Sequence, residues 1–189
     1  MVRWEPGAAE RLREAAMQLY VERGFEQTTV AEIAQRAGVT ARTFFRHFAD
    51  KREVLFAGSE DLAGALQRAV AEAPAGAAPM AVVAAALDVG GRFLGPDRER
   101  TRHRQLIIAA NPELQERELI KLARLGERLA EGLRARGVAP QEAALAAEAG
   151  IVVLRVAFER WLTETDPGDL RAIMREVLTA LGKVTAEQK

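Results

Sequence analysis

The stretch TTVAEIAQRAGVTARTFFRHFADKR, residues 28–52, decides the fold of this chain. It predicts two short helices joined by a tight turn. Thr29 can cap the first helix, because its hydroxyl can accept from the amide three residues on, while Glu32 can reach back to the amide of the cap. Gly38 then ends that helix in a left-handed conformation that costs glycine little. Thr40 is the predicted cap of the second helix.

The two predicted helices differ in what they bury. The first has one apolar face at helical spacing, formed by Val30, Ile33, Ala34 and Ala37. The second buries two phenylalanines one turn apart, Phe44 and Phe48, so its opposite face turns outward. That outward face carries Ala41, Arg42, Phe45 and Arg46. This is the layout of a helix-turn-helix, whose second helix lies in the major groove of DNA.

Positive charge is concentrated in the same window. Five basic residues and one acidic residue between positions 36 and 52 give a local charge of +4, whereas the whole chain has 27 basic and 27 acidic residues. A local basic face attracts phosphates and releases counterions without making the protein basic throughout. The alternative is an ordinary helical hairpin with a solvated charged face. The caps, the turn glycine, the phenylalanine pair and the charges together favour DNA binding.

The segment TTVAEIAQRAGVT followed by TFFRHFADKREVL resembles the TetR family of bacterial transcriptional regulators, over about residues 8–55. The resemblance implies an all-helical homodimer: an N-terminal three-helix helix-turn-helix domain followed by a larger helical domain that binds a small molecule and dimerises. We place the first domain at residues 1–50 and the second at residues 51–189. The family usually has tyrosine where this chain has Phe45, so a phosphate hydrogen bond is lost, and stacking or contact with a thymine methyl group remains.

Each candidate DNA-binding residue has an expected role. We expect Arg42 to contact a base, Thr43 and Phe45 a base or the backbone, and His47 a phosphate. Lys51 is also expected at a phosphate, because it begins a helix whose free amides can bind the same group. That helix is predicted to run from a cap at Asp50 through Ala73; the alternative for Lys51 is a surface lysine without consequence. The full predicted set is Thr29, Thr40, Ala41, Arg42, Thr43, Phe45, Arg46, His47 and Lys51.

Four further helices are predicted at residues 80–94, 98–110, 112–137 and 140–163, and Asp166 with Pro167 is expected to open a last one. Apolar residues at 151–162 cover more than one helical face, which predicts a partner helix in a second copy of the chain. A four-helix bundle across a two-fold axis would bury them. An intramolecular core is the alternative. The predicted dimer residues are Ile151, Leu154, Phe158, Ile173, Met174, Val177, Leu178 and Leu181.

A pocket for a largely apolar ligand is predicted among the helices of residues 80–163. Small residues at 84–86 and at Gly90 can leave space between helices, and such pockets hold few polar groups. The candidate lining residues are Arg92, Gln105, Arg155 and Trp161. The alternative is that the alanines let the helices pack closely, without a cavity. A basic run at 98–104 is interpreted as a solvated face, with an anion site as the less favoured reading.

Composition excludes several classes of function. The chain has no cysteine, so disulfides and thiolate sites are excluded, and neither His47 nor His103 has ligand spacing around it. Phosphate-binding glycine loops and a nucleophile elbow are absent. We therefore expect no enzyme, no cofactor and no metal. The charged start and the short uncharged runs predict a soluble, cytoplasmic protein without a membrane partner.

The sequence as a whole predicts a ligand-responsive transcriptional regulator, a repressor that a small, largely apolar molecule releases from a palindromic operator. Its expected partners are operator DNA, the effector and a second copy of the chain. A transcriptional activator, or an architectural DNA-binding protein without a ligand, is the alternative. The architectural role leaves the long helical region without a task.

Overall fold

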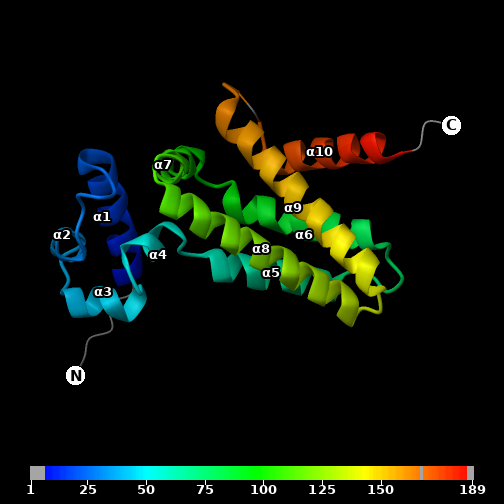
Figure 1. Cartoon of the computed structure of the whole chain (residues 1–189), viewed down its shortest axis with the longest axis horizontal. Coiled ribbons are helices and arrows are strands. Elements are labelled where there is room, and N and C mark those ends of the chain that lie inside the picture. The colour runs from blue at the N-terminus through cyan, green and yellow to red at the C-terminus, as the bar shows by residue number, and fades with distance from the viewer. Residues whose placement is uncertain (1–6, 167, 187–189) are drawn as a thin grey trace. The chain divides into compact units, whose positions relative to one another are not determined.

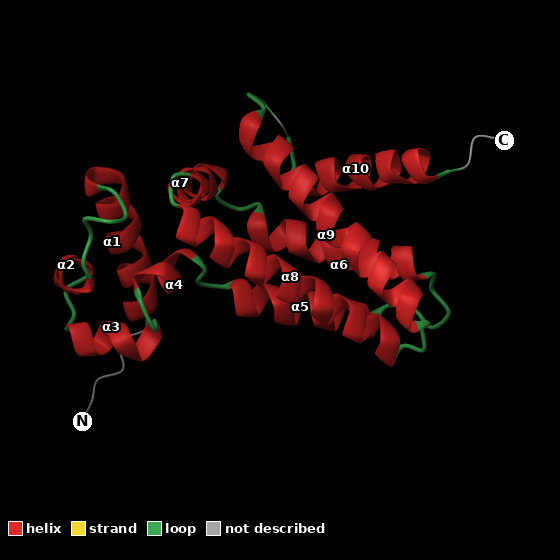
Figure 2. Ribbon diagram, viewed as in Figure 1, coloured by secondary structure: helices red, strands yellow, loops and turns green. Residues whose placement is uncertain are grey.

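The structure, a computed structural model, describes residues 7–166 and 168–186, and within these ranges the chain is helical and contains no strand (Figure 2). The all-α fold class predicted from the sequence is confirmed. The described helices are α1 (Ala8–Arg23), α2 (Val30–Arg36), α3 (Ala41–His47), α4 (Lys51–Leu55), α5 (Ser59–Glu72), α6 (Pro79–Leu94), α7 (Arg98–Ala109), α8 (Pro112–Ala135), α9 (Pro140–Thr163) and α10 (Leu170–Thr185) (Figure 1). None of them is long and apolar enough to cross a membrane.

The chain divides into two compact units. Unit 1 contains the residues up to Gly58 together with residues 102–118, and unit 2 contains residues 59–101 and the residues from Leu119 onward. Helices α7 and α8 therefore each contribute to both units. The functional boundary that we placed after residue 50 stays a prediction. The compact unit that holds the helix-turn-helix is larger, because it also includes α4 and the α7–α8 corner.

Unit 1 has its own hydrophobic core. Helix α1 packs against α2, α3 and α4, and α2 packs against α3. Leu12 and Phe44 are completely buried there, as are Ile108 and Leu114 from the α7–α8 corner. Burial of such a side chain contributes about 1.5–3 kcal/mol. The corner is thus part of the core that supports α2 and α3.

Unit 2 is built around α6, which packs against α5, α9 and α10. Three glycines allow close helix contacts. A Cβ atom on Gly91 would lie 2.6 Å from the Cγ atom of Arg171, and one on Gly150 would lie 2.6 Å from a methyl group of Val83. A Cβ atom on Gly132 would approach a Val70 methyl group to 2.9 Å. These three glycines therefore allow the helices of unit 2 to pack closely.

The long helix predicted from residue 50 to 73 is wrong, because the chain breaks it into α4 and α5. Val54, Leu55 and Phe56 are consecutive and all buried. Successive side chains on a helix point about 100° apart, so one face cannot bury three in a row. The helix ends at Leu55, and Gly58 turns the chain with φ of 87° before α5 begins.

The last helix also begins later than predicted. Its cap is Asp169, whose carboxylate accepts from the amide of Arg171 at 3.1 Å, and its first residue is Leu170. The predicted start at Asp166 lies before this cap. Pro167, the other half of that prediction, lies outside the described residues.

Candidate DNA-binding site

Local hydrogen bonds fix both ends of α2. The Thr29 hydroxyl accepts from the Glu32 amide at 3.2 Å, and the Glu32 carboxylate accepts from the Thr29 amide at 2.9 Å, which completes the predicted capping box. At the other end, Gly38 has φ of 67°, and the amide of Val39 donates to the Ala34 carbonyl at 2.9 Å. This is the Schellman arrangement, and it sets the turn between the two helices.

Helix α3 is anchored by aromatic side chains on one face. Its cap, Thr40, accepts from the Thr43 amide at 3.2 Å, as predicted. Phe44 is completely buried, and its ring lies 5.6 Å from that of Phe48. Phe45 points away from this core and keeps 58% of its surface exposed. The outward face of α3 is thus available to a partner.

The cations on that outward face have no partner among the residues that the structure describes. Arg42 and Arg46 are exposed, and in the part of the chain that the structure describes neither makes a hydrogen bond or an ion pair. His47 is also exposed, and its ring lies 6.4 Å from Phe48. Unpaired cations on one helix face are suited to an anionic partner, because no internal ion pair must be broken first.

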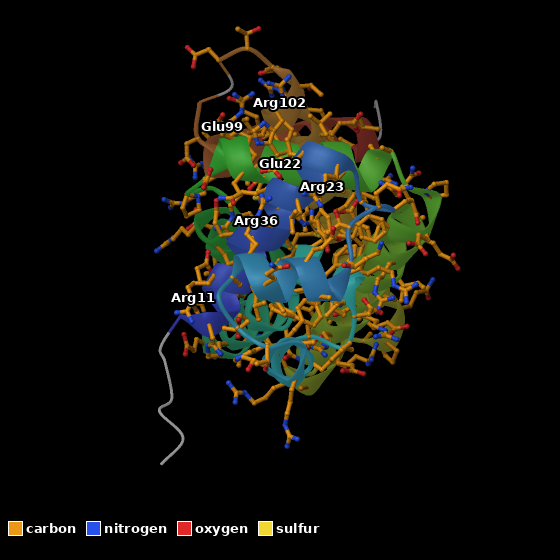
Figure 3. The ribbon with its side chains drawn as sticks, turned by 90° about the vertical axis from the view of Figure 1, so that its left-hand side faces the viewer. Arg11, Glu22, Arg23, Arg36, Glu99 and Arg102 are labelled. Atoms are coloured by element: carbon orange, nitrogen blue, oxygen red, sulfur yellow. The ribbon has the colours of Figure 1, made fainter. Side chains whose placement is uncertain are left out.

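Other basic residues of the same window are paired inside unit 1. Arg36 donates to Glu22 at 2.6 Å, and this hydrogen bond raises the pKa of Arg36 above its ordinary value. Arg23 donates to Glu32 at 2.8 Å, so two ion pairs join α1 to α2. Figure 3 labels Glu22, Arg23 and Arg36 of these pairs. Arg52 pairs with Asp50 at 3.0 Å. The local excess of positive charge is therefore concentrated on α3.

The structure also gives Lys51 a different environment from the predicted one. Its ammonium group donates to the carbonyls of Phe25, Glu26 and Thr28 at 2.8, 3.0 and 3.1 Å. An ammonium group has three donors, so all are used. The amides of Arg52 and Glu53, the second and third residues of α4, donate to Asp50 at 2.8 and 3.1 Å. The Lys51 ammonium group and these two amides are thus hydrogen-bonded within the protein, and the phosphate contact expected of Lys51 stays a prediction.

A second polar anchor, which the sequence did not predict, holds α4 to the α7–α8 corner. Arg104 donates to the Leu55 carbonyl at 2.5 Å and to Glu118 at 3.2 Å, and it lies over the Phe56 ring. Burial lowers the pKa of Arg104 and Glu118 opposes that shift. The signal was the position of Arg104 one turn before the fully buried Ile108, which places both on the inner face of α7.

Comparison with known proteins agrees with this geometry. Residues 12–57 match the description "Bacterial regulatory proteins, tetR family", and residues 77–186 match the MftR C-terminal domain. The chain belongs to the TetR family. It is a transcriptional regulator, and this confirms the prediction that it is not an enzyme.

Individual TetR-family relatives cover different parts of the chain. TcmR of Streptomyces glaucescens, an HTH-type transcriptional regulator, is 38% identical over 77 residues, which are 41% of this chain and 34% of TcmR. FadR of Thermus thermophilus, a transcriptional repressor crystallised with lauroyl-CoA, is 26% identical with a TM-score of 0.58 over 96% of each chain. SmeT, the repressor of the Stenotrophomonas maltophilia efflux pump SmeDEF, is 22% identical with a TM-score of 0.63 over 95% of this chain and 91% of its own, which shows the fold alone.

The four residues predicted to line a pocket in this TetR-family chain have different surroundings within their own units, and their role in a pocket stays a prediction. Gln105 belongs to unit 1, where it donates to Glu118 at 3.0 Å. In unit 2, Arg92 is exposed and pairs with Asp88, and Arg155 is exposed on α9. Trp161 is buried in the unit 2 core. A shallow hollow of about 550 Å3 on the outer side of α10 includes none of the four.

The predicted dimer residues also separate into two groups. Leu154, Ile173 and Met174 lie in the core of unit 2 and present no surface to a second chain. The physical reason is that the apolar stripe of α10 packs against α9 and α6 within unit 2. The remaining predicted residues are partly buried against that core: Ile151, Phe158, Val177, Leu178 and Leu181.

An apolar stripe on α9 that the predicted list of dimer residues omits is exposed. Leu145 is 65% exposed, Val152 40% and Val156 42%. Their spacing of seven and then four residues puts them on one side of the helix. The signal was already in the sequence, because α9 carries apolar residues around more than one face.

Proposed function

We propose that this chain is a homodimeric repressor that binds a near-palindromic operator and releases it when a small, largely apolar molecule binds unit 2. The observation that carries the proposal is the outward face of α3, where Arg42, Phe45 and Arg46 are exposed beside a fixed helix-turn-helix geometry. Because the chain belongs to a family of transcriptional regulators, we assign this face to DNA binding. The other parts of the proposal are the residues that contact DNA, the chemical class of the effector and the surface that forms the dimer.

The DNA contacts are assigned by position on α3. Arg42, in the first turn, reads a base edge, and Thr43 and Phe45 contact a base or the backbone. Arg46 and His47 bind phosphates, since they lie in the last turn, on the unpaired cationic side. Thr29, Thr40 and Ala41 flank this face at the starts of α2 and α3, where backbone amides and hydroxyls approach the phosphates.

The effector is proposed to act on unit 2. The core there consists of Val, Leu, Ala and aromatic side chains, which suits an apolar molecule. The FadR relative contains lauroyl-CoA, a long acyl thioester, which makes acyl thioesters a reasonable first class to test. Because α6 is in close contact with α9 and α10, binding must separate these helices. A ligand shifts the population of states only by its differential affinity for them.

The assembly is proposed from the open stripe on α9. Val152 and Val156, together with the half-buried Leu181 on the neighbouring helix α10, provide a self-complementary surface for a two-fold dimer. Two copies would present two α3 helices to DNA. The half-sites of the operator are then about 34–36 Å apart, or further if the α3 helices are splayed.

Sequencing the fragments of its own genome that the purified protein retains is the decisive experiment. We expect a small set of fragments that share a near-palindrome, whereas the variant Arg42→Ala with Arg46→Ala should retain none above background. Retention without any shared sequence would support an architectural role and contradict the proposed repressor. Binding upstream of genes whose transcription falls when the protein is removed would indicate an activator.

The effector proposal needs a separate experiment. Free fatty acids and acyl thioesters are screened for a rise in melting temperature, which binding to the native state must produce. Hits are then added to the protein and a fluorescent operator. We expect release of DNA, and we expect Ala86→Leu, inside the core, to reduce the response more than Ala85→Leu, at the exposed neighbouring position. Hits that stabilise the protein and never release DNA would contradict the coupling.

A further inference from the structure

Three backbone carbonyls of the loop between α1 and α2 point at one place. The oxygens of Phe25, Glu26 and Thr28 lie 2.8, 3.0 and 3.1 Å from the ammonium nitrogen of Lys51. The same nitrogen lies 4.4 Å from the centre of the Phe25 ring, within range of a cation–π interaction. We call this group of three oxygens and one ring the carbonyl cradle.

Lys51 is fixed at both of its ends. Its own carbonyl accepts from the hydroxyl of Tyr20 at 2.6 Å, and Tyr20 is buried at the C-terminal end of α1. Burial raises the pKa of Tyr20, so its hydroxyl stays protonated and remains a donor. The side chain then spans from α4 to the loop. One residue thus connects α1, the loop before α2, and α4.

The cradle leads directly into the helix-turn-helix. Thr28 is almost completely buried and donates its hydroxyl to Gly24 at 2.8 Å, and the next residue is Thr29, the cap of α2. Movement of the loop therefore moves the start of α2. Without a donor, the converging oxygens would repel one another and lose their hydrogen bonds.

We propose that Lys51 is a positioning residue for DNA binding: its ammonium group holds the carbonyl cradle and so fixes α2 relative to α1 and α4, without contacting a phosphate. The inference rests on the proposed DNA-binding function and deepens it. It also identifies the chemistry of the cradle, which accepts a protonated primary amine because three acceptors match three N–H donors.

Salt dependence separates this role from a phosphate contact. Removal of one phosphate contact reduces the slope of log K against log salt by about 0.9. Arg46→Gln should show that reduction. Lys51→Met keeps an unbranched apolar side chain, one atom shorter, and removes the donors, so it should weaken binding to all sequences alike and keep the wild-type slope. A slope reduced as in Arg46→Gln would overturn the proposal.

Measurements on the DNA-free protein test the cradle independently. The amide of Thr28 donates to the Phe25 carbonyl, so its hydrogen exchange reports opening of the loop. In Lys51→Met we expect this exchange to rise about 10- to 100-fold, the factor for loss of hydrogen bonds to a charged group. Unchanged exchange would overturn the proposal. If the wild type binds no DNA, the proposed function fails, while this measurement still decides about the cradle.

Two further tests remain valid if Lys51→Met folds poorly. In the wild-type protein, the NMR signal of the Lys51 ammonium group should be visible without DNA, because its protons are hydrogen-bonded, and DNA should leave it unshifted; a signal that appears only with DNA would overturn the proposal. In Lys51→Ala, butylammonium should restore operator binding better than tetramethylammonium at equal ionic strength, because only the former has N–H donors. Equal effects of the two salts would contradict the cradle.

Discussion

Phe44 and Phe45 are neighbours in the chain with opposite environments. Phe44 is completely buried, while Phe45 leaves 58% of its surface exposed, and the two rings meet edge to face at 5.5 Å. The buried ring fixes the rotation of α3 about its axis. The exposed ring is thereby held on the same side as Arg42 and Arg46. At the scale of single residues, burial of Phe44 and not of Phe45 therefore orients the proposed DNA-binding face.

Arg42 and Arg46 should differ in what their removal does. Arg42→Ala should relax the preference at one base pair by about 1–3 kcal/mol, because a base contact carries sequence information. Arg46→Ala should weaken binding to every sequence alike and flatten the salt dependence, because a phosphate contact carries no sequence information. Binding of both variants to a panel of single-base operator variants measures this. Equal losses on every sequence for both would show that the two roles are wrongly assigned.

Phe45→Tyr should strengthen DNA binding. The ring is exposed, so the added hydroxyl needs no space in the core, and it can donate to a phosphate. A hydrogen bond of this kind contributes about 1 kcal/mol, which is roughly fivefold in affinity. Fluorescence anisotropy with operator DNA tests it, and the melting temperature of the free protein is the control. Stronger binding to only one operator sequence would indicate a base contact for this position.

At the scale of helices, the sequence predicted the helix ends that local caps determine. It did not predict the features that depend on tertiary packing. Thr29, Gly38 and Thr40 act on amides and carbonyls a few residues away, so the sequence alone predicted the ends of α2 and the start of α3. The end of α4 depends on a core that also contains Ile108, more than 50 positions along the chain. Lys51 is similar, since its acceptors lie 23 to 26 residues before it. Sequence patterns show a cation, and only the fold shows whether it is paired.

The contact between α6 and α9 should be sensitive to one methyl group. Gly150→Ala places a Cβ atom 2.6 Å from Val83, so the helices must shift, at a cost of about 1–3 kcal/mol. Gly182→Ala is the matched control: it also lies within a helix, α10, and its Cβ atom would meet nothing within 4 Å. There we expect stabilisation of up to about 1 kcal/mol, because alanine favours a helix. Urea unfolding of both variants measures the difference, and equal effects would refute the close contact.

The pairing of α6 with α10 should make stability depend on acid pH. Hydrogen bonds from Arg171 at 2.7 and 2.9 Å, and from Arg92, hold the pKa of Asp88 below its ordinary value of 3.8, and Arg175 lies 3.5 Å away. Asp88 therefore stabilises the folded state fully above pH 3.8, and this contribution is lost as the pH falls through the lower, folded-state pKa.

Asp88→Asn should therefore lower the free energy of unfolding at neutral pH, and its difference from the wild type should shrink as the pH falls below 3.8. Unfolding by urea at a series of pH values measures this. Asp61→Asn, at an exposed position on α5, is the control. A gap between wild type and Asp88→Asn that stays constant in acid would contradict the ion pair as its cause.

At the scale of the whole molecule, the lack of net charge makes DNA binding depend on dimerisation. The chain carries no net charge, so its total charge adds no attraction to DNA, and the electrostatic part of the affinity depends on a few local cations on α3. One α3 helix offers only Arg42, Arg46 and His47 outside internal pairs. A monomer therefore makes few phosphate contacts, and a second copy doubles them. Dimerisation is thus expected to decide whether the protein binds its operator at cellular salt concentration.

Disruption of the α9 stripe should abolish dimerisation and operator binding together. Val156→Glu puts a charge on a surface that is 42% exposed in the single chain, so the monomer should fold as before, while burial of an unpaired carboxylate against a second copy is costly. Sedimentation at micromolar concentration should show a monomer for this variant and a dimer for the wild type. Val21→Glu, at a 62% exposed position on α1 in unit 1, adds the same charge outside the stripe and should remain a dimer.

A wild-type monomer would show that the chain has no dimer interface. A dimer of Val156→Glu that still binds the operator would place the interface elsewhere. If Val156→Glu is monomeric yet binds a single half-site with the full wild-type affinity, the argument that one α3 helix has too few phosphate contacts is wrong.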